Sequence, residues 1–214
     1  SLPPDEDAEY RAGYLSGVIR GDGHLGHYSY APRPGRSRDD VHRFRLALVD
    51  LEALRRTRQY LAQCGITTTE FGFHEAVGDQ KAMRAIRTSA RAAVNAIEEI
   101  VRWPWSPSDQ WQKGFLAGIF DAEGGHTSGI LRIFNTDQAI IDQITTCLRR
   151  FSFRFTVETP DREKPVISVR IVGGLRERLR FFHTVDPAIT RKRTIEGMAL
   201  KGRARLGVVS IRSL

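Results

Sequence analysis

Apolar residues recur at helical spacing in some stretches of the chain and alternate with polar residues in others. The helical spacing predicts helices over about residues 10–20, 51–63, 89–101, 137–150 and 175–183, and another that ends at Glu123. The alternating stretches predict strand hairpins, for example 66–76 with 80–88 and 153–159 with 165–172. In the strand near residue 45 the side chains divide between an apolar face, with Phe44, Leu46 and Leu48, and a second face with Arg43, Arg45 and Ala47.

The predicted elements occur twice in the same order, so the chain is an internal repeat. Each half reads as helix, two strands, helix, two strands, helix. We therefore expect an α+β fold of two pseudo-symmetric αββαββα repeats, residues 1–102 and 110–214, joined by a linker at 103–109. Each four-stranded antiparallel sheet would bury one face under helices and leave the other face open to a ligand. The first half has the longer first hairpin, centred on residues 32–40.

One stretch is present in both halves, as LSGVIRGDG at 15–23 and LAGIFDAEG at 116–124. Small residues lie on one stripe of each predicted helix: Gly13, Gly17 and Gly21 in the first copy, Gly114, Gly118 and Ala122 in the second. Because a glycine inside a helix costs about 1 kcal/mol relative to alanine, the stripes need a compensating role. We expect the two helices to pack with their backbones in contact.

Each copy ends in a carboxylate followed by glycine, Asp22 in the first and Glu123 in the second. A carboxylate at this position faces the negative end of the helix dipole, and packing of the helices would also place the two acids side by side. Divalent cations bound between the carboxylates and phosphate oxygens would relieve both penalties. A single helix that ends in Asp-Gly would carry little information, since both residues are common where helices stop.

Composition narrows the class of partner. The 214 residues are 41% hydrophobic and 27% charged, which excludes a disordered chain, and the formal net charge of +8 favours a polyanion. Nucleic acid is the first candidate and an acidic membrane surface the second. No signal peptide or apolar run of transmembrane length is evident, so we expect a reducing cytoplasm. Cys64 and Cys147 are interpreted as small buried apolar residues.

The two motifs resemble those of the LAGLIDADG homing endonucleases in their single-chain form, and the order of elements fits over nearly the whole chain. The resemblance implies a monomer that cuts both strands of double-stranded DNA at a long asymmetric site and leaves short 3′ overhangs. It also implies paired motif helices at the interface of the repeats and a saddle of strands along the major groove. No membrane and no protein partner would be required.

The same resemblance implies a divalent-metal site. Asp22 and Glu123 would bind Mg²⁺ together with the carbonyls of Gly21 and Ala122. Mn²⁺ or Ca²⁺ would substitute for Mg²⁺, and Ca²⁺ is expected not to support cleavage. The family's basic residue near the active site corresponds to Lys192 in the second half, whereas the first half offers no lysine, its nearest cation being Arg102. A phosphate contact is an equal alternative for Lys192.

DNA recognition is assigned to basic residues on strands and loops. They are Arg33, Arg36, Arg38, Arg43, Arg45, Lys81, Arg87, Arg132, Arg154, Arg170, Arg191 and Arg193. For each of these residues a solvated surface charge is the alternative interpretation. His24, His27 and His126 suggest metal ligands only weakly, because polar strand residues entering a groove would explain them equally well. The three tryptophans are expected to pack against the helix pair: Trp103, Trp105 and Trp111.

Two further interpretations accompany the nuclease prediction. Residues 207–211 resemble the point where an intein resumes its splicing fold, which suggests the endonuclease domain of an intein. The other is a nucleic-acid-binding protein without nuclease activity on the same scaffold, either an intron maturase or a transcription factor. The presence of both Asp22 and Glu123 argues against it, because a pure binder gains nothing from two repelling carboxylates near phosphate.

Overall fold

The computed structural model describes residues 2–30, 40–79, 81–127, 129–159 and 165–195. In the first half these residues form α1 (Ala8–Asp22), β1 (Gly23–Ser29), β2 (Asp40–Leu48), α2 (Leu51–Gln63), β3 (Thr69–His74), β4 (Met83–Thr88) and α3 (Arg91–Val101). In the second half they form α4 (Asp109–Glu123), β5 (Gly124–Thr127), β6 (Ile130–Asn135), α5 (Gln138–Arg150), β7 (Phe155–Glu158), β8 (Ile167–Ile171), α6 (Gly174–Val185) and the short 3-10 helix η1 (Thr190–Lys192).

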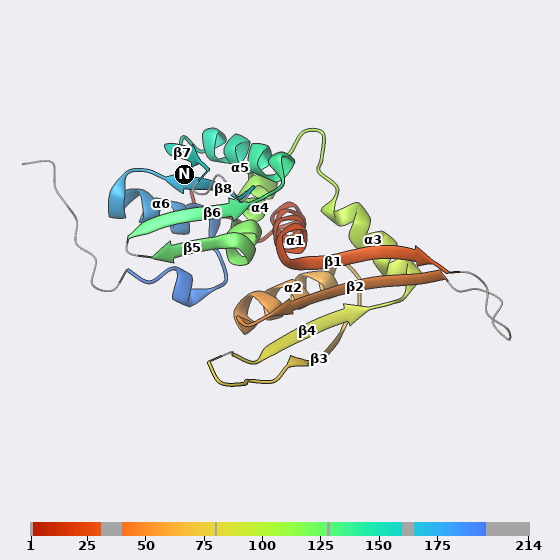
Figure 1. Cartoon of the computed structure of the whole chain (residues 1–214). Helices are drawn as coiled ribbons and strands as arrows, with labels where there is room; N and C mark the ends of the chain where they lie inside the picture. Colours follow the sequence, from red (N-terminus) through yellow and green to blue (C-terminus); the bar gives the residue numbers. More distant parts are fainter. Residues whose placement is uncertain (1, 31–39, 80, 128, 160–164, 196–214) are drawn as a thin grey trace, which may run out of the picture.

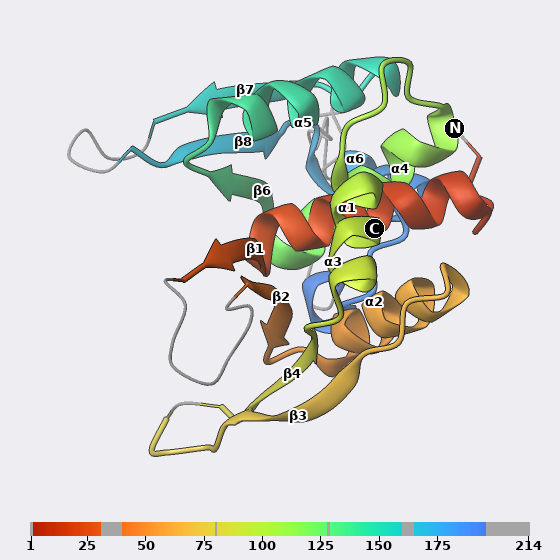
Figure 2. The same ribbon diagram turned by 90° about the vertical axis from the view of Figure 1, so that its right-hand side faces the viewer.

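The two halves have the same topology, which confirms the predicted repeat. Each contains a four-stranded sheet, with strand order β1-β2-β4-β3 in the first and β5-β6-β8-β7 in the second, and every neighbouring pair is antiparallel. The sheets extend to opposite sides of the helix α1 (Figure 1). The strands lie on one side of the molecule and helices α1, α2, α3 and α4 on the other (Figure 2). Each sheet therefore keeps one face open.

The glycine stripes bring α1 and α4 into backbone contact, as the sequence predicts. A Cβ atom added at Gly118 would lie 2.1 Å from the carbonyl oxygen of Tyr14, and one at Gly13 would lie 2.0 Å from that of Trp111. Ala122 takes the place of a glycine near the end of the stripe, opposite Gly21. No side chain larger than hydrogen fits at Gly13 or Gly118, so the small residues fix the distance between the helices.

Local signals set the ends of several helices. The Asp7 carboxylate accepts a hydrogen bond of 2.8 Å from the Tyr10 N–H and so caps α1. The helix therefore begins at Ala8, two residues before its predicted start. Helix α2 has the predicted bounds, and Gly65 stops it with a positive φ of 74°. Ser108 caps α4 by accepting a hydrogen bond of 3.0 Å from the Trp111 N–H.

A single apolar core runs through both halves. Phe44, Leu46 and Leu48 are buried beneath helices, and Arg43 is exposed on the opposite face of β2, which confirms the predicted division of that strand. Tyr10 and Tyr14, both fully buried, carry the core across from the first half to the second. The packing therefore joins the two repeats into one continuous interior.

Two predictions about burial are wrong in part. Cys147 is buried, and burial raises the pKa of its thiol to about 12, but Cys64 is exposed because it follows the last residue of α2 at the surface. Trp111 is buried and Trp103 is half-buried, whereas Trp105 is fully exposed. Trp105 lies in the turn between α3 and α4, where the chain leaves the helix pair.

The unequal hairpins are visible in their strands. Strands β1 and β2 have 7 and 9 residues, whereas β5 and β6 have 4 and 6. Three of the predicted DNA contacts, and the stretch 207–211 that suggests an intein, lie outside the described residues: Arg33, Arg36 and Arg38. Among the helices that the structure does describe, none has both the length and the apolar character needed to span a membrane.

The contact of α1 with α4 predicts a stability effect. Gly118→Ala should lower the free energy of unfolding by about 3 kcal/mol or more, because the new methyl group meets rigid backbone on the facing helix. In a chain of this size that loss corresponds to a Tm lower by roughly 6–12 °C, measurable by thermal denaturation. Gly125→Ala is the matched control, since a Cβ there meets no atom within 4 Å. Equal Tm values for the two variants would contradict the backbone contact.

Candidate active site

The helix packing brings the C-terminal ends of α1 and α4 together. Asp22 is the last residue of α1 and Glu123 the last of α4, and a strand leaves each helix at the next glycine. A Cβ atom at Gly21 would lie 2.5 Å from Cβ of Ala122 and 3.2 Å from Cγ of Glu123, so the two helix ends are in contact. The two acids therefore meet at the boundary between the repeats, where both sheets begin.

The two carboxylates interact unfavourably. Burial raises the pKa of Glu123, and the neighbouring charge of Asp22 raises it further. The pKa of Asp22 is also raised by burial; its side chain is exposed by surface area, but surrounding protein crowds the carboxyl group. Each acid thus prefers its neutral form more than a free carboxyl group would.

Lys192 supplies the one nearby positive charge that acts on both acids within the described residues. Its ammonium group donates hydrogen bonds of 2.6 Å to the Asp121 carbonyl and 3.3 Å to the Phe120 carbonyl, so it neutralises the negative end of the α4 dipole. Its charge lowers the pKa of Asp22 and Glu123, and burial lowers the pKa of Lys192 itself. The structure thus brings the three predicted catalytic residues together.

Asp121 was not predicted as a site residue, although it is the most buried acid at this place. Only 3% of its surface is exposed, and its carboxylate accepts hydrogen bonds from the Tyr14 hydroxyl at 2.8 Å, the Ala188 N–H at 2.7 Å and the Ile189 N–H at 3.0 Å. Burial raises the pKa of this group, while its three donors lower it. An acid inside an otherwise apolar stretch was the available signal, and its partners lie far along the chain.

The donor set suits Mg²⁺. Oxygen ligands from one or two carboxylates, completed by phosphate and water, satisfy this ion better than a closed protein cage would. Burial raises the pKa values of Asp22 and Glu123, so a cation bound between them would favour their charged forms. Near the helix ends, the carbonyls of Ile19, Phe120 and Asp121 accept hydrogen bonds from within the protein. The predicted carbonyl ligands, those of Gly21 and Ala122, are not among these three.

The open face of the first sheet carries guanidinium groups stacked on aromatic rings. Arg45 lies opposite Arg87 on neighbouring strands, with Arg45 4.7 Å from the ring centre of Phe73 and Arg87 4.6 Å from that of Phe71. A groove of about 720 Å³ lies over this part of the sheet, lined by these two arginines, Arg43 and neighbouring residues. Stacking holds each guanidinium flat while leaving its donors free for phosphate or base edges.

The open face of the second sheet is basic as well. Arg132 lies opposite Arg170 on neighbouring strands, and Arg170 also pairs with Glu158 at 3.6 Å. Arg154, exposed just before β7, continues the row at the edge of the sheet. The predicted strand contacts of both halves thus share the open faces, while Lys81 is exposed in the loop between β3 and β4.

Arg191 and Arg193 have protein partners instead. Arg191 makes a two-pronged ion pair with Asp50, with both nitrogen-to-oxygen distances at 2.6 Å. Arg193 donates to the Asp186 carboxylate and to the Pro187 carbonyl, each at 2.8 Å. Their predicted contact with DNA remains a prediction, but both have a structural role without it.

The histidines do not gather at the acids. His24 and His27 point to opposite faces of β1: His24 is hydrogen-bonded to the Tyr28 hydroxyl at 2.8 Å, and His27 contacts His42 and, at 2.7 Å, Glu98. His126 lies against Phe182. Throughout the described residues, no three His, Cys, Asp or Glu side chains converge on a possible metal position. The weak metal-ligand interpretation of the histidines thus finds no support.

Residues 110–186 match the family model described as a LAGLIDADG-like domain. This match lies in the second half of the chain, which therefore resembles a LAGLIDADG-like domain. The homing endonuclease I-DmoI of Desulfurococcus mucosus is 32% identical over 74 residues, which make up 35% of this chain and 37% of that relative. The matched stretch thus covers little more than a third of the relative's length.

Solved structures extend the likeness of the fold to both repeats. The crystal structure of I-DmoI in complex with DNA and Mn has a TM-score of 0.64 at 20% identity, covering 84% of this chain and 97% of that chain. The N-terminal LAGLIDADG domain of DUF199/WhiA has a TM-score of 0.61 at 16% identity, covering 90% of this chain and 87% of that chain. At these identities the likeness shows the fold alone.

Because Asp22 and Glu123 repel each other, removing both charges should stabilise the folded protein. In metal-free buffer at neutral pH, the double variant Asp22→Asn/Glu123→Gln should have a Tm about 2 °C higher than that of the unmodified chain. This shift corresponds to a gain of roughly 0.5–1 kcal/mol in the free energy of unfolding. The pKa values of Asp22 and Glu123 are raised in the folded state, so the folded protein binds their protons more tightly than the unfolded chain does. The stability that this proton binding contributes is fully present below the ordinary carboxyl pKa and is lost as the pH rises through the raised values. The difference should therefore nearly vanish near pH 4. A less stable double variant at pH 7 would contradict the repulsion.

Proposed function

We propose that this protein is a site-specific DNA endonuclease that makes a double-strand break by divalent-metal-dependent hydrolysis of phosphodiester bonds. The observation that carries the proposal is the pair Asp22 and Glu123 at touching helix ends, with Lys192 beside them and an arginine-bearing sheet on each side. This arrangement fits a duplex laid over both sheets, with its middle at the acids. The DNA-bound crystal structure of I-DmoI, a homing endonuclease by name, supports it through the shared fold.

The proposed roles follow from position and charge. Asp22 and Glu123, with the carbonyls of Gly21 and Ala122, would hold Mg²⁺, for which Mn²⁺ or Ca²⁺ could substitute. When bound, the metal ions supply an activated water and stabilise charge at phosphorus and on the leaving oxygen. Lys192 adds positive charge at the phosphate and orients it by hydrogen bonding. Having one acid from each repeat suits one cut in each strand, with short 3′ overhangs.

The DNA contacts are proposed for the open faces of the sheets. Phosphates would bind the exposed arginines and base edges the stacked ones, so that affinity falls as the salt concentration rises. The longer β1 and β2 imply that the first half covers more of an asymmetric target. Contacts of Arg33, Arg36, Arg38, Arg191 and Arg193 belong to the same proposal, as does a monomeric state.

Cleavage of a library of long DNA duplexes with Mg²⁺ tests the enzymatic proposal. The unmodified chain should break both strands at one site, and Asp22→Asn or Glu123→Gln should slow cleavage at least about 1,000-fold, because each removes metal binding worth several kcal/mol. DNA affinity measured without metal should stay the same or rise, because each variant removes a negative charge that faces phosphate. Asp142→Asn, at an exposed carboxylate on α5, is the matched control and should cleave normally.

The same assay separates the nuclease from its rival, a nucleic-acid-binding protein without cleavage on this scaffold. Tight binding of one site that stays intact with Mg²⁺ and with Mn²⁺ would favour the binder and overturn the enzyme. The fold alone does not decide between them, because a binder could use the same arginine-bearing open faces. Two raised carboxyl pKa values at one point favour the enzyme.

The stacked arginines predict a defined loss of DNA affinity. Arg45→Gln or Arg87→Gln should raise the Kd for the target about tenfold, because each removes a preorganised guanidinium from the open face. Titration at several salt concentrations separates the roles, since loss of a phosphate contact lowers the salt slope by about 1. Arg55→Gln, exposed on α2 among the helices, is the control. An equal loss at Arg55 would show that only net charge matters.

A further inference from the structure

The segment after α6 leaves its own repeat and crosses to the first one. Figure 1 shows this blue segment, which contains η1, passing from α6 toward α2. Its first residues already contact the first half, since the Tyr10 hydroxyl donates to the Val185 carbonyl at 2.8 Å and Arg56 donates to the Asp186 carbonyl at 2.6 Å. Lys192 lies on this segment, so its position depends on how the segment is held.

The second repeat holds the segment through Asp121. Both oxygens of this buried carboxylate accept backbone N–H groups, Oδ2 from Ala188 at 2.7 Å and Oδ1 from Ile189 at 3.0 Å. Because backbone groups are the donors, the contact fixes the path of the chain whatever side chains it carries. Three residues further on, Lys192 reaches back to the carbonyl of the same residue at 2.6 Å.

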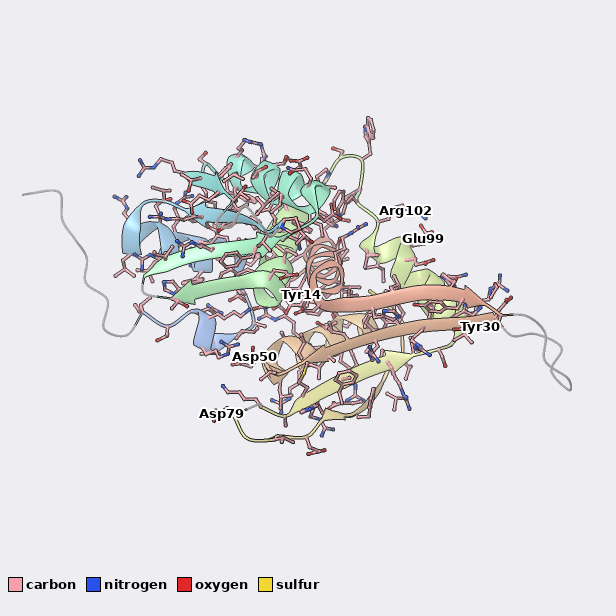
Figure 3. The ribbon with its side chains drawn as sticks, viewed as in Figure 1. Tyr14, Tyr30, Asp50, Asp79, Glu99 and Arg102 are labelled. Atoms are coloured by element: carbon pink, nitrogen blue, oxygen red, sulfur yellow. The ribbon has the colours of Figure 1, made fainter. Side chains whose placement is uncertain are left out.

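The first repeat holds the same segment through two acids at the start of α2. Thr190 donates its hydroxyl to Glu52 at 2.6 Å and its N–H to the same carboxylate at 3.3 Å. Arg191 forks onto Asp50, which keeps only 17% of its side chain exposed and whose pKa this contact lowers. In Figure 3, Asp50 lies at the end of α2 that faces this segment. Lys192 directly follows these two anchored residues.

The corresponding position in the first motif uses the opposite charge. Arg20 occupies the place in LSGVIRGDG that Asp121 occupies in LAGIFDAEG. Its Nε donates at 2.8 Å to the carbonyl of Val101, the last residue of α3, and its guanidinium lies 4.5 Å from the ring centre of Trp103. Each motif helix thus contacts the chain near the end of the third helix of its repeat or just after it. Of these two contacts, the one made by Asp121 holds a segment that places a lysine, Lys192, near the acids.

We propose that Asp121, Asp50 and Glu52 are positioning residues that hold the segment 188–191 from both repeats and thereby place the Lys192 ammonium at the end of the paired helices for strand cleavage. This inference rests on the proposed nuclease function. None of the three acids has to touch DNA or metal in this role. A lysine side chain samples many rotamers, so a site that needs its ammonium group at one place must fix the backbone of that residue first.

Single-turnover cleavage with excess protein measures the effect. Asp50→Asn should slow cleavage about tenfold, because a displacement of 1 Å at a reacting group costs up to roughly 100-fold. The Kd for DNA should stay the same or fall, since Arg191 is released. Asp50→Glu should recover much of the rate by restoring the ion pair. Glu70→Gln, which breaks ion pairs of 2.9 Å and 2.6 Å with Arg58 and Arg84 elsewhere in the first repeat, is the matched control and should keep the normal rate.

A double-mutant cycle distinguishes positioning from a general structural role. In a Lys192→Met background, Asp50→Asn should cause no further loss, because the group that it positions is already absent. A similar fractional loss in both backgrounds, or no loss in the unmodified background, would overturn the proposal. Asp121→Asn should behave in the same way with a larger loss, on the order of 100-fold. Should that variant fail to fold, the cycle at Asp50 alone decides.

Hydrogen exchange gives a readout that needs no cleavage. The amides of Ala188 and Ile189 should be protected in the unmodified chain and exchange faster in Asp50→Asn, while amides of α5 stay unchanged. Unchanged exchange at these two amides would overturn the anchoring from the first repeat. If the unmodified chain cleaves no duplex, the nuclease proposal fails and the role of the anchors in cleavage fails with it. If the unmodified chain cleaves DNA and the effects of Asp50→Asn and Lys192→Met are additive, the positioning role fails while the nuclease proposal stands.

Discussion

Contact between the backbones of α1 and α4 is the constraint on which the other features depend. Without side chains at Gly13 and Gly118, the helices approach until backbone meets backbone, and their ends are then forced together. Asp22 and Glu123 become neighbours for this reason and not because they attract. The sheets start at the same two ends, so their open faces flank the acids. One steric relation thus sets the site and both of its flanks.

The pseudo-symmetry of the scaffold does not extend to its polar contacts. Arg20 and Asp121 occupy equivalent places, yet one donates to a carbonyl and the other accepts from two N–H groups. A chain that follows a helix can be held by either chemistry, because its backbone offers both donors and acceptors. Opposite charges at one motif position therefore preserve the fold and still give each repeat a different surrounding for its acid. Only the second repeat sends a lysine to the centre.

Much of the fold was predictable because it is encoded locally. The bounds of α2 follow from apolar spacing and a glycine stop, and the face of β2 follows from alternation over Phe44, Leu46 and Leu48. The repeated stripe located Asp22 and Glu123 because spacing within a helix determines which residues share a side. These inferences need no knowledge of distant parts of the chain.

The remaining features depend on contacts between distant segments, which a pattern along one chain does not contain. Whether a tryptophan near the linker or a cysteine near a helix end is covered depends on what packs against it, as the exposed Trp105 and Cys64 and the buried Trp111 and Cys147 show. The backbone partners of Asp121 lie 67 and 68 residues away, and Arg191, the partner of Asp50, lies 141 residues away. Lys192 was predicted from a family resemblance, and the residues that hold it were found only in the structure.

The charge distribution explains how such a site can work on DNA. The chain carries a net charge of +8, but its centre holds Asp22 and Glu123, and Lys192 is the cation whose charge lowers the pKa of both. On the proposed function, a duplex would be attracted by the arginines of both sheets and repelled at the middle, so the flanks would supply the energy that brings the phosphates to the acids. Cations that relieve the repulsion bind best when phosphate is present as well. Metal binding and DNA binding should then reinforce each other, and the acids discriminate against metal-free association.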